Sequence, residues 1–387
     1  MSSAVFTTEK IDLIRDALSS CTMCGFCKSV CPSFKAINWD TDLSRGRIVM
    51  TYGLATGQLK ADPSVVQSMY TCTTCADCVR RCPSEVKIVD IIELARADLV
   101  ANGHILPKHK AMCENILNYN NPFAEKESVA EVMAKKGYVP HNAPVAYFAG
   151  CTATYRATKT ADASLSILKK LGVDFTVLPE ICCGSVMGRV GWSEEDLVKI
   201  YQKNVDEIVK LGVKTLVLSC AGCYRMFKIE YPKHVEVPFE VLHMTEFLAK
   251  QDVKLKSLGD VTVTYHDPCH LGRHCGVFDA PRDVIRKFPE VRFKEMKYNK
   301  STSHCCGGGG GVRAAYPEEA ADIANTRLDE ADFADLLITT CPFCVTNLSA
   351  QVGDRKIKVV DLTELVDEHL GACVPRNCSG AGHHAPR

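Results

Sequence analysis

Eight cysteines near the start of the chain fall into two runs of identical spacing. Each run reads Cys-x2-Cys-x2-Cys-x3-Cys-Pro, over residues 21–32 and again over 72–83. In this spacing, which bacterial ferredoxins use, three cysteines ligate one iron–sulfur cluster and the fourth ligates the other. The runs therefore predict two cubane [4Fe–4S] clusters, one held by Cys21, Cys24, Cys27 and Cys82 and the other by Cys31, Cys72, Cys75 and Cys78.

Zinc is the alternative for these eight thiols, because they also suffice for two tetrahedral sites. Zinc sites rarely use this spacing with a trailing Cys-Pro, so the pattern favours clusters. The whole chain has 22 cysteines among 387 residues. A disulfide scaffold would normally be short and secreted, and residues 1–10 are polar where a secretory signal would be apolar. Metal ligation in a reducing compartment explains the cysteines better.

A second group of cysteines belongs to an internal repeat with a spacing of roughly 120 residues. Residues 145–151 match 261–269, residues 181–184 match 304–307, and residues 215–223 match 337–344. Each repeat supplies one single cysteine, one Cys-Cys-Gly and one Cys-x2-Cys. The first set is Cys151, Cys182, Cys183, Cys220 and Cys223; the second set is Cys269, Cys305, Cys306, Cys341 and Cys344.

Five thiolates exceed what one tetrahedral metal or one cubane can use. The Cys-x2-Cys pairs could instead be thioredoxin-like dithiols, but the adjacent Cys-Cys pairs would then be unexplained. The glycine run at 307–311 lacks the Lys-Ser/Thr of a phosphate loop, so we interpret it as a close approach of backbone to a cluster or substrate. Four cysteines outside both patterns are interpreted as small buried hydrophobic residues: Cys113, Cys275, Cys373 and Cys378.

The tandem Cys…Cys-Cys-Gly…Cys-x2-Cys pattern after a double ferredoxin run resembles the catalytic subunit family of heterodisulfide reductase, and the D-type subunits within it. The segments 219–224, 266–273 and 305–311 also read like that family, and the resemblance covers nearly the whole chain. It implies a non-cubane [4Fe–4S] cluster in each five-cysteine set. It also implies that the substrate is the mixed disulfide of coenzyme M and coenzyme B.

Our hypothesis for the mechanism is that the two C-terminal clusters face each other across a pocket and each binds one sulfur of the disulfide. Electrons would arrive through the N-terminal cubanes. The proton donors expected from sequence adjacency are His266, His270 and His304, although a lone histidine is more often structural. Anionic groups of the substrate would be bound by arginines, although surface arginines are usually only solvated: Arg189, Arg225, Arg273 and Arg313.

A non-catalytic electron relay is the second interpretation, as in the iron–sulfur subunits of flavin-linked glycolate, lactate or glycerol-3-phosphate dehydrogenases or of sulfur-metabolism membrane complexes. Two complete five-cysteine sets favour the reductase. The resemblance implies a membrane cytochrome b partner, with a soluble flavoprotein as the runner-up donor. Lys plus Arg and Asp plus Glu number 46 each, so no nucleic-acid partner is expected. We expect a cytoplasmic chain that reaches the membrane, if at all, through a partner protein.

The elements that must position these cysteines follow from hydrophobic periodicity. Residues 1–142 predict a helical two-cluster ferredoxin domain, with a helix capped by Ser84 and ended at Asn102, and a loose linker over 122–144. Residues 143–258 and 259–387 each alternate apolar strands with helices, which predicts two α/β repeats with parallel sheets and a loose tail after 371. The cysteines would lie at the carboxyl ends of the strands.

Overall fold

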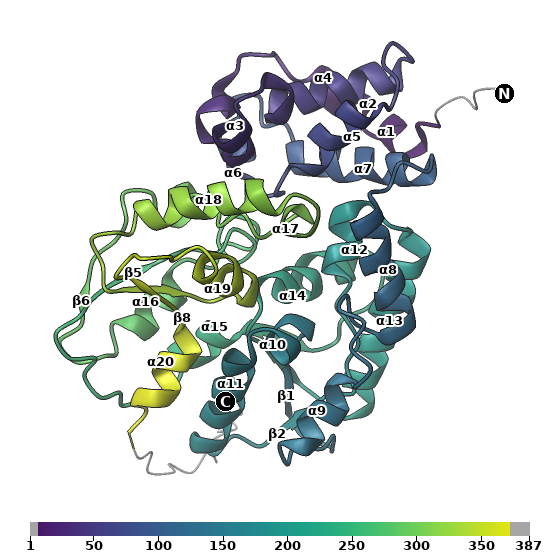
Figure 1. Cartoon of the computed structure of the whole chain (residues 1–387). Helices are drawn as coiled ribbons and strands as arrows, with labels where there is room; N and C mark the ends of the chain where they lie inside the picture. Colours follow the sequence, from purple (N-terminus) through teal and green to yellow (C-terminus); the bar gives the residue numbers. More distant parts are fainter. Residues whose placement is uncertain (1–6, 372–387) are drawn as a thin grey trace, which may run out of the picture.

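The computed structural model describes residues 7–371, and in it a helical N-terminal region lies across two α/β units (Figure 1). The expected tail after residue 371, with Cys373 and Cys378, lies outside the described residues. Of the helices in the described range, none has the length and apolar character needed to cross a lipid bilayer. The expected fold class, a helical ferredoxin region followed by two repeats with parallel sheets, is confirmed.

The N-terminal region consists of short helices that begin and end around the cysteines. Its helices are α1 (Glu9–Asp12), α2 (Arg15–Ser19), α3 (Pro32–Ile37), α4 (Ser44–Ala55), α5 (Pro63–Tyr70), α6 (Asp77–Arg81) and α7 (Ile88–Ala101). Pro32 opens α3 directly after a cysteine, where its missing N–H costs nothing. The prediction that Ser84 caps α7 is wrong: α7 begins after Lys87, because residues 83–87 turn around the cavity of the first four cysteines. Its end at Asn102 is confirmed.

The segment that connects this region to the repeats is ordered, which corrects the expectation of a loose linker. It follows α8 (Pro107–Tyr119), and of the residues expected to be loose, 122–144, it contains α9 (Val129–Lys135). The Asn121 side chain accepts from Phe123 N and donates to Glu125 O, which fixes the turn between the two helices. Ser128 and Glu131 then form a capping box at the start of α9. The Ser-x-x-Glu signal was present in the sequence.

The two repeats form two separate four-stranded parallel sheets. The first has the order β2-β1-β3-β4 and the second the matching order β6-β5-β7-β8. The first repeat contains β1 (Val145–Phe148), α10 (Cys151–Tyr155), α11 (Thr158–Lys170), β2 (Phe175–Val177), α12 (Ser185–Val190), α13 (Glu194–Lys210), β3 (Thr215–Leu218), α14 (Ala221–Arg225), β4 (Glu240–His243) and α15 (Met244–Ala249). The second contains β5 (Thr262–Tyr265), α16 (Asp279–Ile285), β6 (Arg292–Phe293), α17 (Val312–Ala315), α18 (Pro317–Asp329), β7 (Leu336–Thr339), α19 (Pro342–Ser349), β8 (Lys358–Asp361) and α20 (Leu362–His369).

The repeats pack on each other with approximate two-fold symmetry. The first long helix of each repeat contacts the last helix of the other, α11 against α20 and α16 against α15. Equivalent bonds inside the two sheets support the match. Tyr147 bonds to Ser219 at 2.8 Å in the first sheet, and Tyr265 bonds to Thr340 at 2.8 Å in the second. Equivalent residues of the two repeats can therefore meet on the axis between them.

One buried arginine joins the N-terminal region to both repeats. Arg96 on α7 is fully buried, and its guanidinium donates to backbone carbonyls from all three parts of the chain. Within its own region it donates to Met69 O at 2.7 Å and to Cys72 O at 2.8 Å. It also donates to Arg189 O of the first repeat at 2.7 Å and to Gly310 O of the second at 3.0 Å. A buried cation is tolerated only with such partners, so Arg96 fixes how the three parts meet.

Two glycines make this close approach possible. A Cβ on Gly310 would lie 2.4 Å from Cys72 O, and a Cβ on Gly191 would lie 2.4 Å from the carbonyl carbon of Arg96. Both have positive φ, +65° and +82°, which other residues rarely adopt. The glycine run at 307–311 therefore brings backbone against the second ferredoxin cysteine run.

Arg96→Leu should lower the free energy of unfolding by about 3–5 kcal/mol, because it removes a buried charge and leaves several buried carbonyls unpaired. Arg96→Lys should recover only part of the loss, since an ammonium cannot reproduce the planar fork. Thermal unfolding of the anaerobically purified chain measures both. The exposed Arg286→Leu is the control and should change stability by about 0.5 kcal/mol or less. Equal effects of Arg96→Leu and Arg286→Leu would contradict this role.

Candidate functional site

The eight ferredoxin-run cysteines separate into the two predicted groups of four. Each group lines its own small cavity, which is the arrangement that two four-thiolate sites require. The first cavity is lined by Cys21, Cys24, Cys27 and Cys82, and the second by Cys31, Cys72, Cys75 and Cys78. The two groups differ in depth, because Cys24 is exposed whereas Cys31, Cys75 and Cys78 are buried.

The chemistry of these cavities fits iron–sulfur clusters. Burial raises the pKa of Cys31, and burial together with Cys75 raises that of Cys78 well above its usual value. Thiolates at such depth need a cationic centre to compensate their charge, and the iron of a cluster supplies it. The donor set is all sulfur, which suits an iron–sulfide core.

The first five-cysteine set forms an unbroken series of thiol contacts. The sulfur of Cys151 lies 4.0 Å from that of Cys182. Cys183 contacts Cys182 on one side and Cys223 on the other, and Cys223 contacts Cys220. All five side chains are buried. The loop after β1, the Cys-Cys-Gly loop and the turn after β3 thus bring five sulfurs to one place.

The second set repeats this arrangement at equivalent positions. Cys305 contacts Cys269 and Cys306, and Cys344 contacts Cys306 and Cys341. The second cysteine of each Cys-Cys pair has the same electrostatic character in both repeats. Contacts with Cys182 and Cys223 lower the pKa of Cys183 well below its usual value, and contacts with Cys305 and Cys344 do the same for Cys306.

Two further contacts connect the four groups of cysteines. Cys220 and Cys341, which are equivalent residues of the two repeats, contact each other on the axis between them. Cys75 of the ferredoxin region contacts Cys305 of the second repeat. The cysteine sulfurs therefore form a series of contacts that leads from the ferredoxin region to the second five-cysteine set, and from the second set to the first.

A cavity of about 340 Å³ lies beside these sulfurs, between the repeats. From the second repeat it is lined by the glycine run and by four cysteines, Cys269, Cys306, Cys341 and Cys344. From the first repeat come backbone and small side chains that flank the first set, at Ser185, Val186, Ala221 and Gly222. Met112, Phe123 and Phe343 make its wall apolar. The first two belong to the connecting segment, which the sequence reasoning did not associate with the site.

The three histidines proposed as proton donors, and Arg273 among the arginines proposed to bind anions, occupy different places. His270 lines the cavity, and burial lowers its pKa well below the usual value. His266 does not line the cavity but lies against Cys306 and Cys344. His304 stacks on Tyr298 and pairs with Glu330, away from the cavity. Arg273 donates to Cys75 O at 2.7 Å and joins the ferredoxin region to the second repeat.

The other three arginines proposed to bind anions differ in whether a carboxylate is paired with them. Arg189 lines the cavity, but its guanidinium is paired with Glu93 and Glu230. Arg225 is paired with Glu230 at 2.9 Å. Arg313 lines the cavity, is exposed, and has no carboxylate partner among the described residues. Arg313 is therefore available to a ligand anion without first breaking an ion pair.

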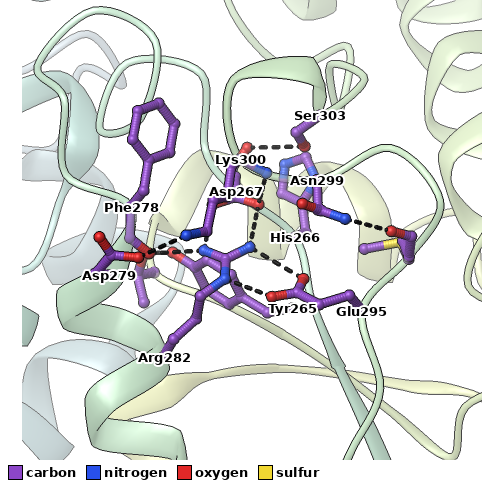
Figure 2. Close-up of polar contacts among 12 residues, drawn as sticks. Tyr265, His266, Asp267, Phe278, Asp279, Arg282, Glu295, Asn299, Lys300 and Ser303 are labelled. Carbon is purple, nitrogen blue, oxygen red and sulfur yellow. Dashed lines mark hydrogen bonds and ion pairs between the residues drawn. The ribbon is translucent and has the colours of Figure 1, made fainter.

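A buried carboxylate fixes the two cysteine loops of the second repeat (Figure 2). Asp267 forms a bidentate ion pair with Arg282, at 2.7 and 2.9 Å, with both side chains buried. It also accepts from Lys300 N at 2.8 Å, and its carbonyl accepts from Ser303 Oγ at 3.3 Å. Glu295 bonds to the same guanidinium. Asp267 precedes Cys269, while Lys300 and Ser303 precede the Cys-Cys pair, so one residue holds both loops.

In the first repeat a buried acidic side chain also joins the two cysteine loops, but it belongs to the other loop. Its buried carboxylate is Glu180, just before Cys182, and it accepts from Ala149 N at 2.9 Å and Gly150 N at 2.5 Å, just before Cys151. Burial raises the pKa of Glu180 well above its usual value. No signal in a single sequence indicated that Asp267 and Glu180 play matching parts, because they lie at different positions of the repeat.

Comparisons with known proteins agree with this geometry. The family model for a 4Fe-4S dicluster domain matches residues 17–86, and that for a cysteine-rich domain matches 145–228 and 263–349. The fold and the site define an iron–sulfur protein in which a dicluster domain is joined to two cysteine-rich domains. The chain belongs to the family of heterodisulfide reductase D subunits.

Several individual proteins support that statement. The D subunit of the dihydromethanophenazine:CoB–CoM heterodisulfide reductase of Methanosarcina mazei is 38% identical, over 92% of this chain and 94% of that protein. The B subunit of the fumarate reductase (CoM/CoB) of Methanothermobacter marburgensis is 31% identical, over 90% and 72%. A solved structure of a hypothetical protein from Helicobacter pylori has a TM-score of 0.56 at 14% identity, covering 83% of this chain and 66% of that one, which shows a similar fold.

Asp267→Asn should destabilise the chain by about 3–5 kcal/mol, because it leaves the Arg282 charge buried without its full partner. Denaturation of the anaerobic protein measures the loss. The matched control is Asp283→Asn, whose partner Arg286 is exposed, and it should change stability by about 0.5 kcal/mol or less. Similar stabilities of the two variants would show that Asp267 does not hold the loops.

Proposed function

We propose that the chain is the disulfide-reducing subunit of a heterodisulfide reductase and that it reduces the mixed disulfide of coenzyme M and coenzyme B to the two thiols. The observation that carries this proposal is the cavity between the two five-cysteine sets, because four of its lining residues are cysteines of one set. A pure electron relay needs no cavity of about 340 Å³ beside its sulfurs. The identity of the proposed substrate is taken from the names of the heterodisulfide reductase relatives.

The reaction consumes two electrons and two protons as one S–S bond breaks and two S–H bonds form. Iron–sulfur clusters supply one-electron transfers and iron atoms with affinity for thiolate sulfur. The series of thiol contacts suggests the order in which electrons would pass through the clusters held by the four ligand sets. The ferredoxin sets come first, the second five-cysteine set follows through Cys75 and Cys305, and the first set comes last through Cys341 and Cys220.

Side chains of the cavity suit the two halves of such a substrate. The apolar wall of Met112, Phe123 and Phe343 would bury an alkyl chain and exclude water. Arg313 would bind a sulfonate or phosphate group. His270 has a buried Nε2 without a partner among the described residues, so it can hydrogen-bond a released sulfur. We propose four clusters in total, two cubane and two non-cubane, with the ligand sets described above.

The electron donor would bind at the exposed end of this series. Cys24 is exposed, and the neighbouring Met23 and Phe26 are 41% and 54% exposed. We propose that this face receives a membrane protein of the cytochrome b type, with a soluble flavoprotein as the second candidate. The chain would then lie in the cytoplasm and reach the membrane through that partner.

A role as relay subunit of another oxidoreductase is the competing function. The fumarate reductase relative favours it, because that protein combines a similar chain with a different named activity. Its name still includes CoM and CoB, so a thiol–disulfide reaction at this kind of chain would be common to both.

Alanine replacement of Cys182 or Cys305 should abolish disulfide reduction and leave the cubane signals intact. The wild-type chain, purified without oxygen, should carry about sixteen irons, and each variant about four fewer. Iron analysis, electron paramagnetic resonance and turnover with a one-electron donor measure these. The buried, isolated Cys113→Ala is the control and should keep its iron. Full turnover in both variants would end the proposal, as would a wild-type content of eight irons.

Arg313→Gln should raise the KM for the mixed disulfide by roughly ten- to hundredfold, the effect of losing one charge-assisted hydrogen bond. The change in kcat should be smaller, because Arg313 touches no reacting sulfur. Steady-state kinetics separates the two. The control is Arg292→Gln, an exposed arginine outside the cavity, with an unchanged KM. If Arg313→Gln also kept its KM, the anionic groups would bind elsewhere.

A further inference from the structure

The two five-cysteine sets differ at one equivalent position. In the matched sheets, Tyr147 of β1 corresponds to Tyr265 of β5, because each bonds to the residue that precedes Cys220 or Cys341. The residue after each tyrosine is therefore also equivalent: it is Phe148 in the first repeat and His266 in the second. Both are completely buried.

The ring nitrogens of His266 have defined roles. Its Nδ1 accepts a hydrogen bond from Arg327 Nε at 3.1 Å. Arg327 is itself fully buried and is held by Glu330, Ser303 Oγ and Tyr298 O. A guanidinium always carries its protons, so Nδ1 must present a lone pair and a neutral imidazole carries its proton on Nε2.

This Nε2–H points to the second cysteine set. Nε2 has no partner among the described residues although it is buried. His266, Cys306 and Cys344 place one ligand-type atom each within 4.8 Å of one another. The His266 side chain contacts the thiol of Cys306. A buried donor without a partner is costly, and the sulfurs are the acceptors within reach.

We propose that His266 donates its Nε2–H to the sulfurs of the second set and makes the cluster held there easier to reduce than the cluster of the first set. The inference rests on the proposed function, since it requires a cluster in each set. Hydrogen bonds to sulfur stabilise the reduced form, which carries more negative charge, and so raise the reduction potential. In the first repeat Phe148 packs against Phe227 and offers no donor.

A positively charged side chain acts in the same direction as this N–H donor. Arg273 is half-buried, lies beside Cys75 and Cys269, and donates from Nε to Cys75 O at 2.7 Å. The equivalent position in the first repeat, four residues after Cys151, is Tyr155. The second set thus has a fixed cation and a fixed N–H donor, and the matching residues of the first repeat supply neither. Electrons entering through Cys75 would collect next to the cavity.

A role for His266 as an iron ligand does not fit its hydrogen bonds. Coordination through Nε2 needs a lone pair on that nitrogen, and the Arg327 bond assigns the lone pair to Nδ1. His266 is therefore a positioning and tuning residue of the cluster, and its test is a potential rather than an activity.

The test is an anaerobic redox titration of the full chain followed by electron paramagnetic resonance. His266→Phe, which copies the first repeat, should lower the midpoint potential of one cluster by at least about 59 mV, a tenfold change in a one-electron equilibrium. The shifted signal should be the one that Cys305→Ala removes. His266→Gln keeps an N–H donor and should recover part of the shift. His109→Phe, at another buried histidine, whose Nε2 bonds to Gly311 O, should leave the potentials unchanged.

The outcomes are distinct. Sixteen irons in His266→Phe with unchanged potentials would overturn the inference and leave the proposed function standing. A loss of about four irons in His266→Phe, with the wild type intact, would make His266 a ligand and would also overturn it. A wild-type content of eight irons would instead refute the proposed function on which the inference rests.

Discussion

The structure depends on the cost of burying arginine. A guanidinium removed from water must have its N–H groups paired, and here the partners are backbone carbonyls from different parts of the chain. Arg96 joins the ferredoxin region to both repeats, and Arg273 joins the carbonyl of Cys75 to the second repeat. Since these carbonyls belong to a cysteine run, satisfying the charges also brings Cys75 against Cys305. Domain assembly and sulfur contact therefore follow from one constraint.

Duplication explains the core of the molecule and also why its halves differ. Two copies of one α/β unit pack about an approximate two-fold axis, and equivalent cysteines, Cys220 and Cys341, meet on it. The ferredoxin region breaks this symmetry, because its Cys75 contacts the second repeat's set. The cavity breaks it again, because its cysteines come from that same set. The symmetric scaffold thus has one half that differs from the other, because this half contacts the ferredoxin region and contributes the cysteines of the cavity.

Much of this could be predicted from spacing alone. The fold class, the two parallel sheets and the separation of the ferredoxin cysteines follow from residue types at fixed intervals. Long-range contacts could not be predicted, because sequence separation carries no information about them. His304 is adjacent to Cys305 yet faces Glu330, and Phe123 is remote in sequence yet lines the cavity. The prediction that Ser84 caps α7 was wrong, because the turn around the cysteines, and not a capping side chain, determines where α7 begins.

The opposite placement of Glu180 and Asp267 has a consequence for how such duplicated chains can diverge or recombine. In one half the acid sits on the loop before the paired cysteines, and in the other it sits on the loop before the single cysteine. A chimera that exchanged only one of these loops between halves would leave one half with two mutually repelling acids and the other with none. The two cysteine loops of one half therefore act as a matched pair, and exchanging both together would keep one buried acid in each half.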